Sequence, residues 1–218
     1  MKLTVIETWP WGKFIKKLRT VTLLGDKKIF PYKNASVSFK VVGSDVVLPI
    51  SKYVLAENLK TQKKLHETLL KQHSLDTLHL NNDKSTISYK IRGDYGEWLM
   101  SPPVVEISKL DGGKAILLDG EHRFVMARKL KQSVGVVWIE GVDKQIPPIA
   151  KPISWNEVNE YNTVPELAQK RVFRYPSLKS FPDISSFSNV KIDKENFRYF
   201  YYRDLSPICN SFVRKPSK

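Results

Sequence analysis

The sequence predicts an α+β fold, in which a small mixed sheet is packed with helices and carries extensions at both ends. Short β-branched runs at residues 46–51, 104–107, 115–118 and 134–139 have the composition of buried strands. Residues 57–73 and 121–131 are instead rich in helix formers. Hydrophobic residues make up 41% of the 218 positions and aromatic residues 11%, enough for one principal core.

The composition indicates a polyanionic partner. Lysine and arginine number 36 against 22 aspartates and glutamates, which gives a net charge of +14. Because so large a charge repels itself in the compact state, we favour nucleic acid or nucleotide phosphate as the partner over a merely solubilising cationic surface.

The single cysteine, Cys209, cannot form an internal disulfide, and the sequence has no zinc-type cluster of cysteine and histidine, so we expect a reducing, intracellular setting. No apolar run approaches the roughly 20 residues of a membrane span. The first residues also lack the apolar core of a signal peptide. The expectation is a cytoplasmic protein with no membrane partner. Nothing in the sequence indicates the oligomeric state.

Residues 1–45 are expected to form a mixed, β-rich N-terminal arm. Residues 2–8 alternate like a strand, residues 13–19 form a short basic helix or turn, and residues 20–24 and 36–42 are β-rich. Its paired tryptophans are compatible with base stacking, but we expect ordinary packing of Trp9 and Trp11.

Residues 46–142 are expected to form the core. Pro49 places the first strand at a sheet edge or ends it, and the helix at 57–73 follows. The basic side chains of this helix and of the helix at 121–131 form either a solvated face or contacts with a nucleic-acid backbone. The candidates for nucleic-acid binding are Lys60, Lys63, Lys64, Arg128 and Lys129.

An insertion at 74–101 and a second hairpin complete the core. Residues 86–91 alternate like a strand and residues 93–96 have the composition of a turn, which predicts a hairpin within the insertion. The strands at 104–107 and 115–118 form another hairpin by their spacing.

Residues 143–218 are expected to form a helical and aromatic-basic extension. Ser154 to Glu157 and Thr163 to Glu166 each have the capping-box pattern, which predicts two short helices. The aromatic and basic residues at 196–203 either pack on the main domain or form a base-stacking surface. We expect packing, because so many exposed aromatic side chains are costly.

The most informative stretch follows the strand at 115–118. The apolar run breaks at Asp119 and Gly120 and continues as a helix, so the polar residues through Arg123 lie at a helix N-terminus. Unpaired N–H groups and the positive end of the helix dipole favour phosphate there. The alternatives are that Asp119 is a turn or N-cap residue, His122 a hydrogen bonder at the helix start and Arg123 a surface ion-pair residue.

Together, the order of elements and the sequence Asp-Gly-Glu-His-Arg at 119–123 resemble the ParB/sulfiredoxin superfamily over about residues 46–142. The resemblance implies a nucleotide-binding enzyme that uses ATP, ADP or CTP with Mg²⁺. It assigns phosphate binding to Gly120, Glu121, His122 and Arg123, catalysis to Asp119 and His122, and the Mg²⁺ contact to Asp119. Sulfiredoxin itself matches poorly, because its reactive cysteine is replaced by Glu121.

Glu57 is the candidate catalytic base. In the branch of this superfamily that phosphorylates free serine, a glutamate follows a similar Leu/Ile-Pro-Ile strand and acts as the base, and Glu57 follows Leu48-Pro49-Ile50 here. Such a base deprotonates a hydroxyl group or water for in-line attack on a phosphoryl group. The alternative is a carboxylate that stabilises the helix start.

Three functions remain, and we expect an enzyme. The first is a ParB-like nuclease or ATPase that acts on or with DNA, favoured by the net charge. The second is a kinase of a small hydroxyl substrate such as free serine, favoured by Glu57. The third is a non-catalytic, nucleotide-gated DNA-binding protein. The third is disfavoured because residues 143–218 show no helix-turn-helix pattern of the usual length.

Overall fold

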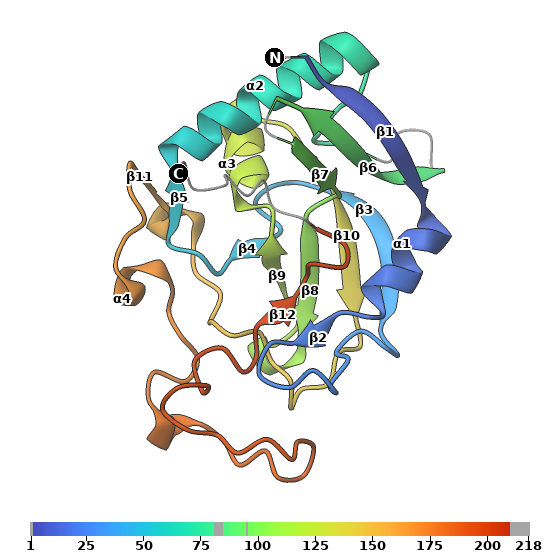
Figure 1. The fold of residues 1–218 in the computed structure, drawn as a ribbon. Coiled ribbons are helices and arrows are strands. Elements are labelled where there is room, and N and C mark those ends of the chain that lie inside the picture. The colour runs from blue at the N-terminus through green and yellow to red at the C-terminus, as the bar shows by residue number, and fades with distance from the viewer. Residues whose placement is uncertain (1, 81–84, 95, 210–218) are drawn as a thin grey trace.

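A five-stranded mixed sheet lies at the centre of the protein (Figure 1). In order across the sheet, its strands are β3 (Ser36–Val42), β10 (Val134–Glu140), β8 (Val104–Ser108), β9 (Lys114–Asp119) and β4 (Leu48–Pro49). The pairs β3–β10 and β8–β9 are antiparallel, whereas β10–β8 and β9–β4 are parallel. This computed structural model describes residues 2–80, 85–94 and 96–209. The mixed sheet with packed helices confirms the predicted α+β class.

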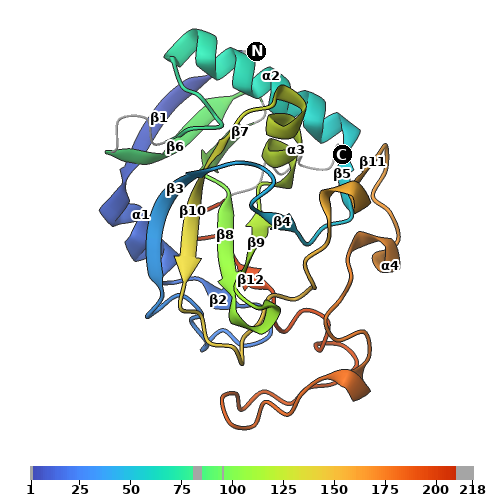
Figure 2. The ribbon, with the colours of Figure 1, turned by 180° about the vertical axis from the view of Figure 1, so that it is seen from behind.

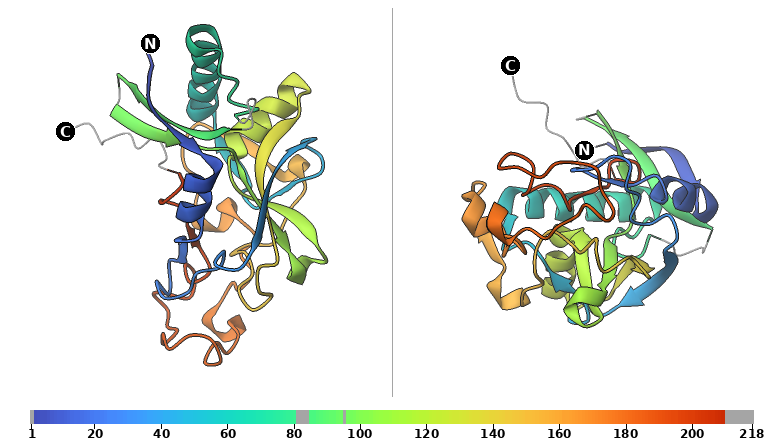
Figure 3. Two further views of the ribbon diagram at one scale, coloured as in Figure 1. Left: turned by 90° about the vertical axis from the view of Figure 1, so that its right-hand side faces the viewer. Right: turned by 90° about the horizontal axis from the view of Figure 1, so that it is seen from below.

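Both faces of the central sheet are covered by other parts of the chain. Successive side chains of a strand point to opposite faces, and here they pack into two different hydrophobic clusters. In β8, Val104 packs in a cluster with Ile208 of the C-terminal segment. The next residue, Val105, packs with Phe124 of helix α3 (Glu121–Leu130). The C-terminal segment therefore covers one face and α3 the other, as Figure 3 shows for the segment. Burial of the strand predicted at 134–139 is confirmed in β10, whose residues are buried except Trp138 and Glu140.

Helix α2 (Ala56–His73) lies along one end of the central sheet, beside α3 (Figure 2). Its apolar side chains Leu59, Leu65 and Leu69 are buried, while its lysines face outward. The short strand β5 (Tyr53–Leu55) leads directly into it. The helix predicted at 57–73 is confirmed, with its start one residue earlier.

A second, three-stranded sheet contains the predicted insertion. Strands β6 (Thr86–Gly93) and β7 (Gly96–Met100) form the expected antiparallel hairpin, in which Gly93 is opposite Gly96. Tyr95 of the predicted turn lies outside the described residues. The third strand is β1 (Thr4–Pro10), which pairs antiparallel with β6.

The N-terminal segment forms the expected strands and short helix. Its three strands belong to three different sheets. Helix α1 (Trp11–Leu18) follows β1 and buries Phe14 and Leu18, and Trp11 stacks on Phe14. Strand β2 (Thr22–Leu23) pairs with β12 (Arg203–Asp204), and β3 forms the edge of the central sheet. Ordinary packing is confirmed for Trp11, which is partly buried against the core.

The C-terminal extension wraps around the loop between β4 and α2. Strand β11 (Asn159–Tyr161) pairs in parallel with β5, and Ile153 N–H donates to the carbonyl of Pro49 at 2.9 Å. Farther on, Phe200 and Tyr201 are buried in an aromatic cluster with Phe181. This burial confirms that these aromatic side chains pack on the main domain. Residues 210–218 lie outside the described range.

The two predicted capping boxes have different outcomes. Ser154 and Glu157 form a capping box, but it opens a single 3₁₀ turn, η2 (Trp155–Glu157). The box predicted at Thr163 is wrong. Pro165 excludes helical geometry at Val164, so helix α4 (Leu167–Lys170) begins later, with Glu166 as its N-cap. The remaining short turns are η1 (Lys109–Asp111) and η3 (Leu178–Ser180).

Candidate functional site

The turn from Asp119 to Arg123, the motif turn, connects β9 to α3 as predicted. Gly120 lies between the two elements with φ +100°, which is a left-handed conformation. A Cβ atom on Gly120 would lie 2.6 Å from Cβ of Pro103. Glycine is therefore needed both for the backbone angle and for the approach of Pro103. Because Gly120 is the N-cap of α3, the alternative that Asp119 is the N-cap is wrong.

Arg123 points into the protein, where its side chain is 10% exposed. Its Nη1 atom donates a hydrogen bond to the carbonyl oxygen of Ser101 at 2.5 Å. Its Nη2 atom lies 3.8 Å from Oδ2 of Asp119. Arg123 does form an ion pair, but the alternative of a surface residue is wrong, because the guanidinium is buried. The charge of Arg123 is balanced within the protein.

The carboxylate of Asp119 has a second neighbour, from the C-terminal segment. Cys209 Sγ donates to Oδ2 of Asp119 at 3.5 Å. Burial raises the pKa of the Cys209 thiol, which keeps it protonated and able to donate. Asp119 is therefore held between a cation and a thiol.

His122 joins the motif turn to the start of α2. Its Nε2 atom accepts a hydrogen bond from the backbone N–H of Leu55, the N-cap residue of α2, at 3.3 Å. Burial lowers the pKa of His122, so the ring is neutral and its proton is on Nδ1. The alternative that His122 is a hydrogen bonder at a helix start is therefore confirmed. The helix start that it binds is that of α2, whereas His122 itself belongs to α3.

This hydrogen bond joins the motif turn to the residue that precedes α2, the helix that carries Glu57. Glu57 is exposed in the first turn of α2, two residues after Leu55. The structure thus brings the segment that carries the predicted base beside the predicted phosphate site. The two are more than 60 residues apart in sequence.

The ionisation of Glu121, the first residue of α3, is strongly perturbed. Burial raises the pKa of its carboxyl group to about 7. The positive charge of Arg171 opposes this shift, and the negative charge of Asp119 adds to it. Glu121 therefore exchanges a proton near neutral pH.

The raised pKa predicts that stability falls as the pH rises from 4.5 to 7. In this window the folded protein retains a proton that the unfolded chain, with its ordinary pKa of 4.5, has released. Glu121→Gln removes this cost. Urea unfolding should show a gain on the order of 2–3 kcal/mol at pH 8 that shrinks to less than about 1 kcal/mol at pH 5.

Glu67→Gln is the matched control, since Glu67 is an exposed acid on α2. It should change the free energy of unfolding little at either pH. An equal effect of Glu121→Gln at both pH values would contradict the assignment.

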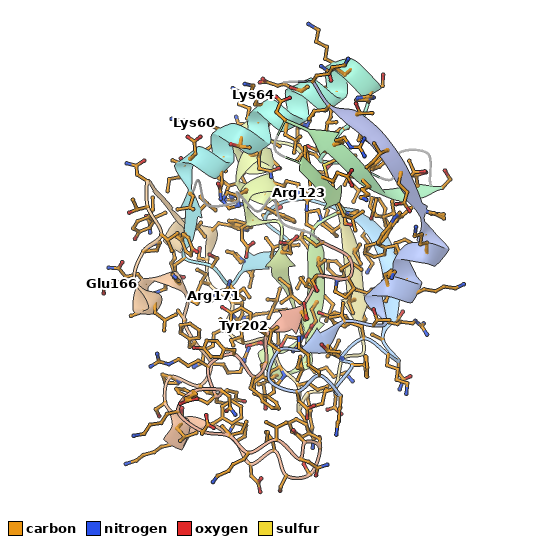
Figure 4. The ribbon with its side chains drawn as sticks, in the orientation of Figure 1. Lys60, Lys64, Arg123, Glu166, Arg171 and Tyr202 are labelled. Atoms are coloured by element: carbon orange, nitrogen blue, oxygen red, sulfur yellow. The ribbon has the colours of Figure 1, made fainter. Side chains whose placement is uncertain are left out.

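The predicted nucleic-acid ligands are exposed side chains of α2 and α3. Figure 4 shows Lys60 and Lys64 along the outer edge of α2, with Arg123 in the interior beneath it. Two basic residues of α3 have partners within the protein. Lys129 forms an ion pair with Glu160, and the guanidinium of Arg128 lies 5.3 Å from the ring centroid of Trp155. Lys63 is exposed on α2, with Nζ 3.9 Å from Oε1 of Glu67.

The sequence did not reveal Arg171, the cation whose charge acts on Glu121. It lies in the C-terminal extension, about 50 residues after the motif turn, and no motif surrounds it. Only the folded chain brings it near the turn.

The described residues contain no group of three or more His, Cys, Asp or Glu side chains that could hold a metal ion. Within the same residues, no helix is both long and apolar enough to cross a membrane.

The ParB CE domain matches residues 13–159, which is more than half of the chain. The protein belongs to the ParB CE domain family. The ParB CE domain begins within α1, includes the central sheet and the motif turn, and ends in β11. This membership confirms the ParB-like resemblance, and it leaves Arg171 outside the matched residues. No curated protein and no solved structure matches the chain.

Proposed function

We propose that the protein is a nucleotide-binding enzyme that performs phosphoryl chemistry on or with DNA, as a ParB-like nuclease or ATPase. The observation that carries this proposal is the hydrogen bond from Leu55 N–H to His122 Nε2. It brings together a turn suited to phosphate binding and an exposed carboxylate, Glu57, suited to activating a nucleophile. Membership of the ParB CE domain family supports DNA as the partner.

Each residue of the motif turn has a different expected role in phosphate binding or in positioning. The first backbone N–H groups of α3, beside Gly120, are suited to bind phosphate oxygens. Arg123 holds Asp119 in place, and His122 holds the start of α2. Glu57 then accepts the proton of the attacking hydroxyl group or water.

The carboxylates of the turn fit Mg²⁺ with ATP, ADP or CTP. In proteins Mg²⁺ is commonly held by one or two carboxylates together with substrate phosphates, and not by an all-protein cage. Asp119 and Glu121, whose charges act on one another, are the carboxylates that would hold it. When bound, Mg²⁺ neutralises the charge that develops on the phosphoryl oxygens.

A kinase of a small hydroxyl compound such as free serine is the second candidate. The position of Glu57 favours it, because a base beside a phosphate site serves a hydroxyl acceptor as well as water. An ATPase differs from this kinase only in the acceptor of the phosphoryl group, whereas a nuclease attacks the phosphodiester of DNA. Both the destination of the phosphoryl group and DNA cleavage must therefore be measured.

The deciding experiment incubates the full chain with Mg²⁺ and γ-labelled ATP, alone, with DNA, and with free serine. We expect label in inorganic phosphate, with release stimulated by DNA, or strand cleavage of the DNA. Label on serine would replace the first candidate by the second. If the protein neither binds nor turns over ATP, ADP or CTP and leaves DNA intact, the proposal is wrong.

A further inference from the structure

An aspartate, a histidine and a serine form a chain of contacts beside the start of β10. Oδ2 of Asp76 is 2.8 Å from Nδ1 of His79, and Nε2 of His79 is 3.0 Å from Oγ of Ser133. Asp76 and His79 lie in the connection that follows α2, and Ser133 directly precedes β10. The two ring nitrogens thus contact a carboxylate and a hydroxyl group, in the arrangement found in serine hydrolases.

The contacts of Asp76 determine which ring nitrogen of His79 carries the proton. Oδ1 of Asp76 accepts a hydrogen bond from Leu78 N–H at 2.8 Å. Burial raises the pKa of Asp76, but the hydrogen bonds from His79 and Leu78 outweigh it and hold the pKa below its ordinary value. The ionised carboxylate can only accept, so the neutral ring of His79 carries its proton on Nδ1. Nε2 therefore accepts a hydrogen bond from the hydroxyl group of Ser133.

This arrangement pairs a nucleophile with a general base. When Oγ of Ser133 forms a bond, its proton can pass directly to Nε2 of His79. A second histidine, His66, has Nδ1 2.9 Å from Oγ1 of Thr77 and 3.8 Å from Oδ1 of Asp76. Thr77 is only 1% exposed, so that hydroxyl group is closed to a substrate. The pair of His79 and Ser133 is the one that a substrate can reach.

Main-chain contacts hold the two segments of the site together. Gly135 N–H donates to the carbonyl oxygen of Leu78 at 2.7 Å, which bonds the residue before His79 to the strand that follows Ser133. Leu78 and Leu80, on either side of His79, are both buried. The imidazole and the hydroxyl group are thus fixed relative to one another before any ligand binds.

The three side chains are also accessible. Those of His79 and Asp76 are 25% and 27% exposed, and Ser133 is half-buried. Within the part of the chain that the structure describes, the backbone N–H of Ser133 makes no hydrogen bond. In serine hydrolases the N–H of the nucleophile is one of the donors that stabilise the oxyanion. A nucleophile, its base and one candidate oxyanion donor therefore lie together.

We propose that Ser133 is the nucleophile of an ester-hydrolysing site, with His79 as its general base and Asp76 as a positioning residue that acts through His79. The substrate class is a carboxylic ester with a small acyl group, because a half-buried hydroxyl group leaves little room for a branched one. The site uses no residue of the motif turn, so the inference does not rest on the proposed function.

The expected reaction is hydrolysis in two steps through an acyl-serine. Oγ of Ser133 bonds to the ester carbonyl carbon while its proton passes to Nε2 of His79, and the carbonyl electron pair moves to the oxygen. That pair returns as the bond to the alcohol oxygen breaks, and the alcohol takes the proton from Nε2. Water then attacks the acyl group in the same way, which releases the carboxylic acid and restores the hydroxyl group.

The test treats the full chain with a fluorophosphonate probe, which phosphonylates an activated serine with loss of fluoride, and with p-nitrophenyl acetate. We expect one adduct, located by mass spectrometry on Ser133, and release of p-nitrophenolate above the buffer rate. Ser133→Ala should abolish the adduct and return ester hydrolysis to the buffer rate. His79→Ala should slow labelling by about 100- to 10,000-fold, and dissolved imidazole should restore part of it.

The role of Asp76 is measured from the pH dependence of labelling. The rate should increase with pH as His79 loses its proton. Asp76→Asn should slow labelling and shift this profile to lower pH, because the imidazolium loses its carboxylate neighbour. A merely structural role of Asp76 would leave the profile in place. The matched control is His66→Gln, which removes the other histidine beside Asp76 and should retain labelling of Ser133.

The labelled position decides the inference without any variant, so the result holds even if a substitution unfolds the chain. No adduct, or an adduct on another residue, would overturn it. Labelling of Ser133 that is as fast in His79→Ala as in the wild type, or that is lost equally in His66→Gln, would overturn His79 as the base. None of these outcomes bears on nucleotide binding at the motif turn.

Discussion

Glu57→Gln should reduce turnover by about 100- to 10,000-fold while leaving nucleotide affinity nearly unchanged. The amide has the size of the carboxylate but cannot accept a proton from the nucleophile. It also keeps the backbone of α2, so the hydrogen bond between Leu55 and His122 is retained. Release of labelled phosphate and calorimetric titration measure turnover and affinity separately.

Glu67→Gln is the control for this change as well, since it neutralises another exposed acid of α2. It should leave turnover within about twofold of the wild-type rate, because it lies two to three turns farther along the helix. Full activity of Glu57→Gln would remove Glu57 as the base. Loss of affinity together with turnover would indicate a role in binding.

Arg203→Leu should lower the free energy of unfolding by about 3–5 kcal/mol. Arg203 and Glu106 are both buried, with Nη2 2.8 Å and Nε 3.1 Å from the carboxylate oxygens. Tyr32 donates a further hydrogen bond to the same carboxylate at 3.0 Å. Without the arginine, a buried charge keeps only the tyrosine as a partner. Urea unfolding measures the loss.

Lys27→Met tests a neighbouring ion pair of a different kind. Lys27 pairs with Asp204 at 2.6 Å, but its side chain is 56% exposed. Its removal should cost less than about 1 kcal/mol. The double variant Glu106→Met with Arg203→Leu should recover part of the loss, because no buried charge remains. A loss in Arg203→Leu no larger than in Lys27→Met would contradict the assignment.

Local patterns predicted much of the fold. The break at Asp119-Gly120 located the junction of β9 and α3, and the glycines at 93 and 96 located the hairpin of β6 and β7. Both signals depend on backbone angles that a few neighbouring residues determine. The helix at 57–73 followed from its periodicity in the same way.

The partners of these elements depend on contacts between distant residues, which local patterns do not contain. β1 pairs with a strand about 80 residues later, and β2 with one about 180 residues later. The sequence places Glu106 within the apolar strand at 104–107. It does not indicate that Arg203 is the partner that permits the burial of Glu106. Likewise, Arg123 was expected to face a ligand, yet its environment is inside the protein.

The candidate site was predictable only where its residues belong to a local sequence pattern. The motif turn and Glu57 were identified from residues close to recognisable elements, and the structure brings them together through His122. Arg171 follows a short helix whose N-cap carries no side-chain bond, in a segment without periodicity. Its position results from backbone hydrogen bonds to Lys52 and Lys151, which no sequence pattern indicates.

The buried pair of Glu106 and Arg203 also affects the order of events during synthesis. The two residues are 97 positions apart, so translation at roughly 5–20 residues per second delivers the arginine about 5–20 s after the glutamate. During that interval the growing chain contains β8 with an uncompensated carboxylate. The sheet face that the C-terminal segment later covers is also open to water. The buried pair and the cover over this sheet face therefore form only after β10, the last strand of the central sheet, has been synthesised, and until then the chain exposes apolar surface that favours aggregation.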